Sequence, residues 1–79
     1  MAKLRVRVSF PEEKITEPVI YQIGREYNLT TNIRRADVTE KTGWVDLELI
    51  GEPVEIERGI AGLKSKGVRV DPIEKNIIE

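Results

Sequence analysis

The residues best suited to bind a small molecule lie in the segment Tyr27–Val38, where a helical pattern gives way to an extended one. Asn32 carries an amide that both donates and accepts hydrogen bonds, and Ile33 beside it offers an apolar surface. We expect this pair to stand at the junction between the helix and the strand, with its side chains available to a ligand. The competing role, which is common for asparagine, is that the Asn32 amide caps the backbone of the loop.

Two adjacent arginines follow this pair in the sequence. Guanidinium groups bind carboxylates and phosphates through paired hydrogen bonds, so Arg34 and Arg35 are suited to an anionic group. The alternative is that both are solvated beside acidic neighbours such as Asp37. The candidate ligand-binding residues are Asn32, Ile33 and Arg35.

The composition removes most catalytic chemistry. The chain has no Cys and no His, so it lacks thiol nucleophiles, imidazole bases, disulfides and the usual zinc and iron–sulfur ligands. Its carboxylates show loop or helix-surface spacing, without a convergent acid–base pair. We therefore nominate no catalytic residue and no metal site, and we expect neither a cofactor nor enzyme activity.

The charge balance argues against nucleic acid as the partner. Thirteen Lys and Arg stand against 14 Asp and Glu, and the net charge is -1. Lys3, Arg5 and Arg7 project from one face of the first predicted strand and resemble an RNA-binding platform. We expect Asp46 and Glu48 to pair with the arginines across neighbouring strands. A single Trp also supplies too few rings for stacking bases.

Hydrophobic periodicity predicts four strands and two helices. The first strand alternates apolar and polar residues and ends at Pro11, and the first helix uses Thr16 as its cap and stops at a left-handed Asn28. The remaining expected elements are a strand over about 32–39, a turn over 40–43, a strand over 44–50, a helix closed by Gly67, and a strand near 68–72. The order βαββαβ predicts an α+β, ferredoxin-like fold: a four-stranded antiparallel sheet with both helices on one face.

A break in alternation marks the second of these strands. Ile33 cannot share a face with Ala36 and Val38 if side chains alternate strictly, so we expect a bulge near Arg34 and Arg35. Bulges redirect side chains and are frequent beside binding sites.

The sequence also predicts how three glycines and a tryptophan pack. Gly59 and Gly62 match a GxxG pattern, but they lie in an amphipathic helical segment, where we expect them to allow close approach of helix and sheet; Gly24 is expected to do the same. We expect Trp44 to cover the edge of the core, with a ligand pocket or a dimer contact as alternatives.

The length and the terminal segments predict the setting of the chain. Seventy-nine residues with 39% apolar content make one domain over residues 1–79, small enough that oligomerisation commonly adds stability, so we expect a homodimer. The sequence offers neither a signal-peptide core nor a membrane span, and we expect a cytoplasmic location without membrane insertion. The tail Glu74–Glu79 is expected to dock elsewhere or to lead into further chain.

The chain resembles the NIL domain, a ferredoxin-like module at the C-terminus of methionine-importer ATPase subunits and at the N-terminus of certain ferredoxin-type proteins. The resemblance spans nearly the whole chain. It rests on Phe10–Pro11, on Pro18–Ile20 leading to Tyr27–Asn28, on Asn32-Ile33-x-x-Ala36-x-Val38, on the Gly43 hairpin, and on Ile60-x-x-Leu63 leading to Gly67-Val68-x-Val70.

The resemblance implies a regulatory sensor, because paired NIL domains of the transporter members bind methionine near their interface and thereby restrain ATP hydrolysis. Asn32 and Ile33 match the family's Asn-Ile-Leu motif, whereas Arg34 replaces the leucine and makes the segment more similar to the ferredoxin-fused branch. We expect a non-enzymatic homodimeric sensor of methionine or a related sulfur compound. The alternative is a protein-interaction module that docks a transporter ATPase or a ferredoxin-type redox partner without binding a ligand.

Overall fold

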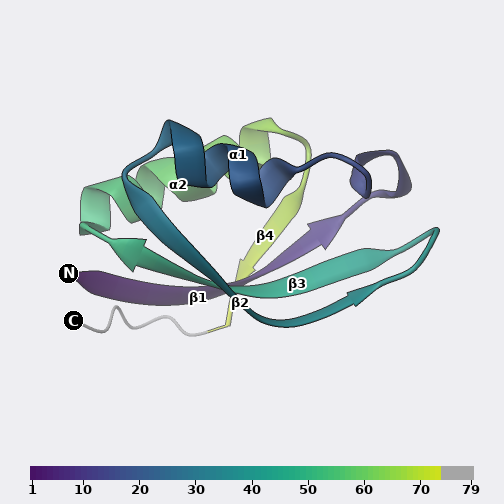
Figure 1. Cartoon of the computed structure of the whole chain (residues 1–79), viewed down its shortest axis with the longest axis horizontal. Coiled ribbons are helices and arrows are strands. Elements are labelled where there is room, and N and C mark those ends of the chain that lie inside the picture. The colour runs from purple at the N-terminus through teal and green to yellow at the C-terminus, as the bar shows by residue number, and fades with distance from the viewer. Residues whose placement is uncertain (74–79) are drawn as a thin grey trace.

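The computed structural model describes residues 1–73, which form one four-stranded sheet with two helices packed on one of its faces (Figure 1). The elements are β1 (Ala2–Phe10), the single 3-10 turn η1 (Glu12–Lys14), α1 (Val19–Glu26), β2 (Leu29–Val38), β3 (Gly43–Gly51), α2 (Pro53–Ser65) and β4 (Arg69–Pro72). The strands are antiparallel neighbours in the order β2-β3-β1-β4. The predicted α+β, ferredoxin-like fold is confirmed. Within residues 1–73 neither helix is long and apolar enough to cross a membrane.

The core lies between the helices and the two central strands. Apolar residues alternate along β1 and β3, so every second side chain faces the helices and is removed from water. The largest fully buried side chains are Val6, Val8, Val19, Ile23, Leu47, Leu49, Ile56 and Leu63. We call the opposite side of the sheet, which carries no helix, the open face (Figure 1).

The first helix begins at Val19, near the predicted start, but both predicted caps are wrong. The N-cap residue of α1 is Pro18, and no side chain caps this end of the helix. The N–H of Val19 donates its hydrogen bond to the backbone carbonyl of Glu17 and not to the predicted Thr16 side chain. No residue other than glycine has a positive φ within residues 1–73, so Asn28 is not left-handed. Its N–H donates a 2.9 Å hydrogen bond to the Glu55 carboxylate of α2. A tertiary contact therefore replaces the local cap.

The second strand begins earlier than predicted. β2 starts at Leu29, immediately after the end of α1, rather than near Asn32. Asn32 consequently lies inside the strand, opposite Glu48 of β3, and not at the junction between helix and strand. The predicted bulge is confirmed: Ile33 pairs with Leu47 and Arg35 with the adjacent Asp46, which leaves Arg34 as the extra residue.

Two glycines of α2 let this helix lie close to the segment that links α1 and β2. A Cβ atom on Gly59 would stand 2.5 Å from Cδ1 of Leu29, and one on Gly62 would stand 2.6 Å from the Tyr27 ring. The contact with Leu29 of β2 confirms the predicted close approach of helix to sheet at Gly59, whereas Gly62 lies close to the residue that ends α1 and not to the sheet. The same prediction for Gly24 is wrong, because its Cβ would meet Thr31 at an ordinary distance of 3.9 Å. Gly67, with a φ of 88°, ends α2 as expected.

We expect Gly62→Ala to lower the free energy of unfolding by about 1–3 kcal/mol, because the added methyl group would overlap the Tyr27 ring in a packed region. Gly24→Ala is the matched control. It is also a helical glycine but meets no close contact, so alanine should leave stability unchanged or raise it by up to about 1 kcal/mol. Urea unfolding of both variants measures the difference, and equal stability of Gly62→Ala and the wild-type protein would contradict the close contact.

Candidate functional site

The candidate residues lie on β2, which forms an edge of the sheet and is almost entirely exposed. Asn32 stands opposite Glu48 and Arg35 opposite Asp46, so both side chains belong to the open face. Ile33 stands opposite the core residue Leu47 and points to the helix side, where it is 56% exposed. The structure therefore brings Asn32 and Arg35 to one face and places Ile33 on the other.

The Asn32 amide is available to a ligand. The side chain is exposed, and no residue within 1–73 forms a hydrogen bond with it. Since Asn32 lies within a strand, the expected alternative, a cap on a loop backbone, does not hold for the described part of the chain.

The centre of the open face is a ladder of ion pairs between β1 and β3. The Arg7 guanidinium donates two hydrogen bonds to the Asp46 carboxylate, at 2.6 and 3.0 Å, and Arg5 lies 3.6 Å from Glu48. These pairs confirm the predicted cross-strand arrangement. The two carboxylates are only 8% and 7% exposed as residues, and the hydrogen bond from Arg7 holds the pKa of Asp46 below its usual value.

Trp44 lies on the open face beside this ladder and not at the edge of the core. It stands opposite Ser9, on the same side of β3 as Asp46, and is partly exposed. The guanidinium of Arg7 lies 4.1 Å from the centroid of its ring and that of Arg35 lies 5.7 Å from it. The predicted packing of Trp44 against the core is wrong, because alternation along β3 assigns the core side to Val45.

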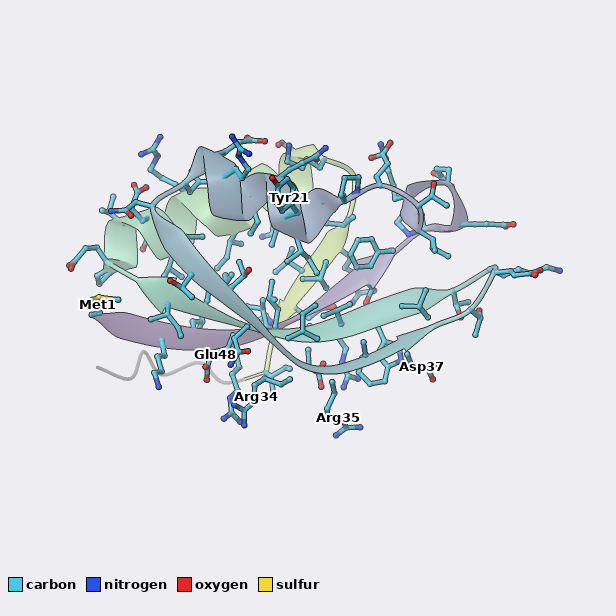
Figure 2. All side chains as sticks on the ribbon, in the orientation of Figure 1. Met1, Tyr21, Arg34, Arg35, Asp37 and Glu48 are labelled. Atoms are coloured by element: carbon cyan, nitrogen blue, oxygen red, sulfur yellow. The ribbon has the colours of Figure 1, made fainter. Side chains whose placement is uncertain are left out.

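The bulge places a second arginine of β2 on the open face. Figure 2 shows Arg34 and Arg35 both below the sheet, on the side away from the helices. Together with Arg5, Asp46 and Ile73 they line a hollow of about 280 Å³. Neither arginine forms an ion pair with Asp37 or Glu40 in the described chain.

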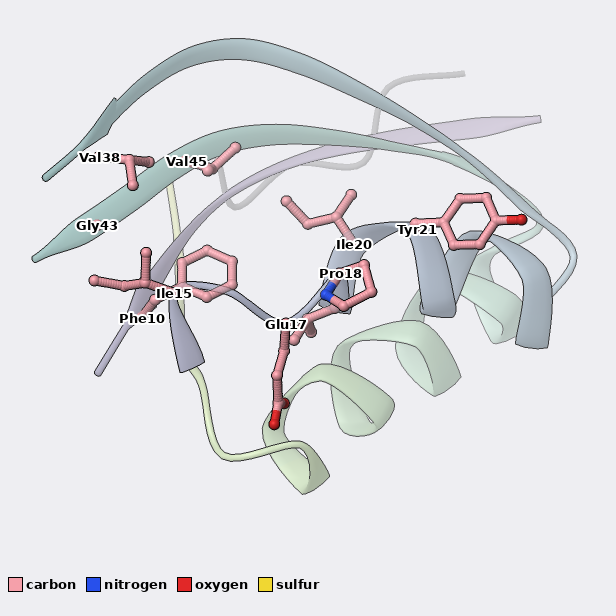
Figure 3. A pocket seen from close by; sticks show the side chains of 10 residues that line it. Phe10, Ile15, Glu17, Pro18, Ile20, Tyr21, Val38, Gly43 and Val45 are labelled. Carbon is pink, nitrogen blue, oxygen red and sulfur yellow. The ribbon is translucent and has the colours of Figure 1, made fainter. Parts of the chain in front are cut away.

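A further pocket lies on the helix side of the sheet, between the start of α1 and the far end of the β2–β3 hairpin (Figure 3). It has a volume of about 200 Å³, and its apolar lining includes Phe10, Ile15, Ile20, Val38 and Val45. Val38 is 54% exposed. The sequence analysis does not predict this pocket. Two apolar residues in unusual places could have indicated it, Ile15 in a polar loop and Val38 at the end of an edge strand.

The chemistry that these surfaces offer is binding through an amide, guanidinium groups and apolar side chains. Within residues 1–73 no three acidic side chains gather in the way that a metal site requires. Asn32 and Arg35 can hydrogen-bond a carboxylate, and the exposed Ile33 can contact an apolar group on the opposite side of the strand.

Comparison with known proteins identifies a family and finds similar solved structures. The model of the family described as NIL domain matches residues 4–72. The crystal structure of the C-terminal domain of an ABC transporter ATP-binding protein from Enterococcus faecalis is similar, with a TM-score of 0.78 and 26% sequence identity. The similarity covers 92% of this chain and 86% of that one. No curated protein sequence matches the chain.

The Arg7–Asp46 ion pair should make the stability of the fold depend on pH. Because the folded-state pKa of Asp46 is lowered, its contribution to stability is fully present above the ordinary Asp value of about 4 and is lost as the pH falls through the lowered folded value. Asp46→Asn should therefore be less stable than the wild-type protein at pH 7, and the difference should shrink below about pH 4.

Chemical denaturation at both pH values tests this expectation. Asp37→Asn is the control, since Asp37 lies on the same face but is exposed, and it should change stability less at pH 7. A stability difference between wild type and Asp46→Asn that stays constant from neutral to acid pH would contradict the assigned ion pair.

Proposed function

The chain belongs to the NIL domain family, and from this premise we propose that residues 1–79 form a non-enzymatic, cytoplasmic regulatory domain that binds methionine or a related sulfur compound near a homodimer interface. Similarity to the C-terminal domain of an ABC transporter ATP-binding protein supports regulation of a transporter ATPase as its setting. The ligand-binding residues in this proposal are Asn32, Ile33 and Arg35.

The observation that carries the proposal is the position of Asn32 and Ile33 on opposite sides of an edge strand. Adjacent side chains on opposite faces cannot enclose a ligand that lies over one face alone. A molecule that contacts both must lie against the edge of β2. There the amide of Asn32 and the guanidinium of Arg35 hold the carboxylate of the amino acid, while Ile33 contacts its apolar side chain.

A ligand at the edge of β2 is fully enclosed only if a second protomer covers its outer side. One side of the ligand rests against β2, and its other side stays in water unless another chain covers it. Ile33 and Val38 are both exposed apolar residues of β2, and a partner strand that packs along this edge would remove them from water. The ligand and the dimer interface therefore stabilise each other.

The regulatory step is a shift between arrangements of the dimer. A ligand between two protomers binds one arrangement more tightly than the other and stabilises it by the difference in affinity. The transporter ATPase or another attached partner then responds to the arrangement and not to the ligand itself.

A second candidate function is a protein-interaction module that binds no small molecule. The observation that favours it is the length of the exposed edge, since β2 has 10 residues and can accept a strand from a transporter ATPase or a ferredoxin-type partner. An iron–sulfur cluster in such a complex would belong to the partner, because this chain has no Cys.

An NMR titration of labelled protein with methionine, homocysteine and leucine distinguishes the two functions, with sedimentation to follow the oligomeric state. The sensor should give saturable shifts at Asn32 and Ile33 with the sulfur compounds and should become more dimeric. Asn32→Ala should weaken binding about tenfold, because a charged carboxylate loses its amide partner. Thr30→Ala, also exposed and on the same face of β2, is the control and should bind normally.

Two results would reject the sensor assignment. If Asn32→Ala folds and keeps full affinity, the ligand does not lie at this edge. If no compound shifts any resonance up to millimolar concentration, the interaction module is the better description.

A further inference from the structure

The bulge in β2 changes which face its arginines occupy. In a regular strand two successive residues point to opposite faces, so one of Arg34 and Arg35 would face the helices. The extra residue between Ile33 and Arg35 interrupts this alternation. Both guanidinium groups consequently lie on the open face, where Figure 2 shows them side by side along β2.

Three acidic side chains of the open face, those of Asp46, Glu48 and Asp71, are engaged by other arginines, whereas Asp37 on the same face forms no ion pair within residues 1–73. Arg7 holds both oxygens of Asp46, Arg5 lies beside Glu48, and Arg69 lies 2.9 Å from Asp71. None of these three ion pairs includes Arg34 or Arg35. The acids of β3 and β4 therefore pair with arginines of β1 and β4, and Arg34 and Arg35 form no ion pair within residues 1–73.

Arg34 and Arg35 differ from the other arginines of this face. Within residues 1–73 Arg34 makes no ion pair, hydrogen bond or ring contact. Arg35 contacts the ring of Trp44, whose centroid lies 5.7 Å from its guanidinium carbon. Both side chains are exposed, so their donors are free to turn toward a ligand.

The two arginines border a hollow whose size and charge fit a small anion. Its volume is about 280 Å³, near the lower limit of about 300 Å³ for pockets that take drug-sized molecules. Three guanidinium groups line it, from Arg5, Arg34 and Arg35, against the single carboxylate of Asp46. Since Arg7 holds that carboxylate and Arg5 lies beside Glu48, the excess positive charge of the hollow comes from Arg34 and Arg35.

We propose that Arg34 and Arg35 form a binding site on the open face for a small molecule with a doubly charged oxyanion, either a phosphate group or a pair of carboxylates. Guanidinium groups bind such oxygens through forked hydrogen bonds, and two adjacent forks match two negative charges. Arg5, which lies 3.6 Å from Glu48, also lines the hollow. A nucleic acid strand fits less well, because the face alternates cations with acids and the chain has a net charge of -1.

This site goes beyond the proposed sensor function. The amino-acid site lies at the outer edge of β2 and uses Asn32 and Ile33, whereas the anion site lies over the sheet and depends on Arg34. The two share Arg35. Changes at Arg34 and at Asn32 therefore separate them.

The test is an NMR titration of the 79-residue chain with sodium phosphate and with sodium succinate, each compared with sodium chloride at equal ionic strength. We expect saturable shifts of the backbone amides of 33–36 and of the side-chain Nε–H groups of Arg34 and Arg35 with phosphate or succinate. A response to phosphate alone identifies a phosphate compound as the ligand class, and a response to succinate alone identifies a dicarboxylate. Shifts that rise linearly, or that chloride reproduces, would overturn the site.

Substitutions distinguish specific anion binding at Arg34 from non-specific attraction to positive charge. Arg34→Gln should weaken anion binding at least about tenfold. Arg34→Lys, which keeps the charge and loses the fork, should also weaken it severalfold. Lys41→Gln, which removes an exposed positive charge from the turn of the same hairpin, is the matched control and should change affinity less than about twofold.

Thermal unfolding confirms that each variant is folded before it is titrated. Equal losses in Arg34→Gln and Lys41→Gln, or full affinity in Arg34→Lys, would overturn the proposal. Methionine titrations of the same proteins keep the two sites distinct. Arg34→Gln should bind methionine as the wild-type protein does, and Asn32→Ala should bind phosphate normally, so failure of one assignment leaves the other intact.

Discussion

The antiparallel register between β1 and β3 is the constraint on which the other features depend. It pairs Val6 with Leu47 on the helix side and, one residue further along β1, Arg7 with Asp46 on the open face. A slip of one residue would turn each apolar side chain toward water and each charged one toward the core. The hydrophobic core and the ladder of ion pairs are therefore two results of one alignment, and neither can change alone.

β2 departs from this alignment at one residue, and the surfaces of interest result from that departure. The register shift after Ile33 lets Ile33, Ala36 and Val38 share the helix side although their numbers differ in parity. Its counterpart on the other face is the gathering of Arg34 and Arg35. A single inserted residue thus gives one side of the strand an apolar row and the other side a concentration of positive charge.

The features that the sequence predicts are those with strong local or pairwise signals. Alternation in β1 and β3, the left-handed Gly67, the bulge inferred from a conflict of parity, and the pairing of Arg7 with Asp46 are all readable without coordinates. The errors arise where tertiary contacts decide the outcome. The Glu55 carboxylate takes the place of a left-handed Asn28, and neighbours on β3 extend β2 back to Leu29 through threonines that show no apolar alternation. The apolar pocket depends on where α1 begins and on how the hairpin extends past it, and the hollow of the open face depends on Ile73 lying near the bulge arginines; no local pattern contains either arrangement.

The exposed edge of β2 also bears on how the chain avoids aggregation. A long edge strand presents unpaired backbone groups that can template the addition of further strands, and proteins commonly interrupt such edges with bulges and charged residues. β2 contains both devices at the same place, because Arg34 is the bulged residue and Arg35 follows it. An incoming strand with regular geometry can stay in register on only one side of this irregularity. The bulge therefore acts as a steric filter at the edge, which accepts a strand of matching shape and stops the stacking of arbitrary strands into larger sheets.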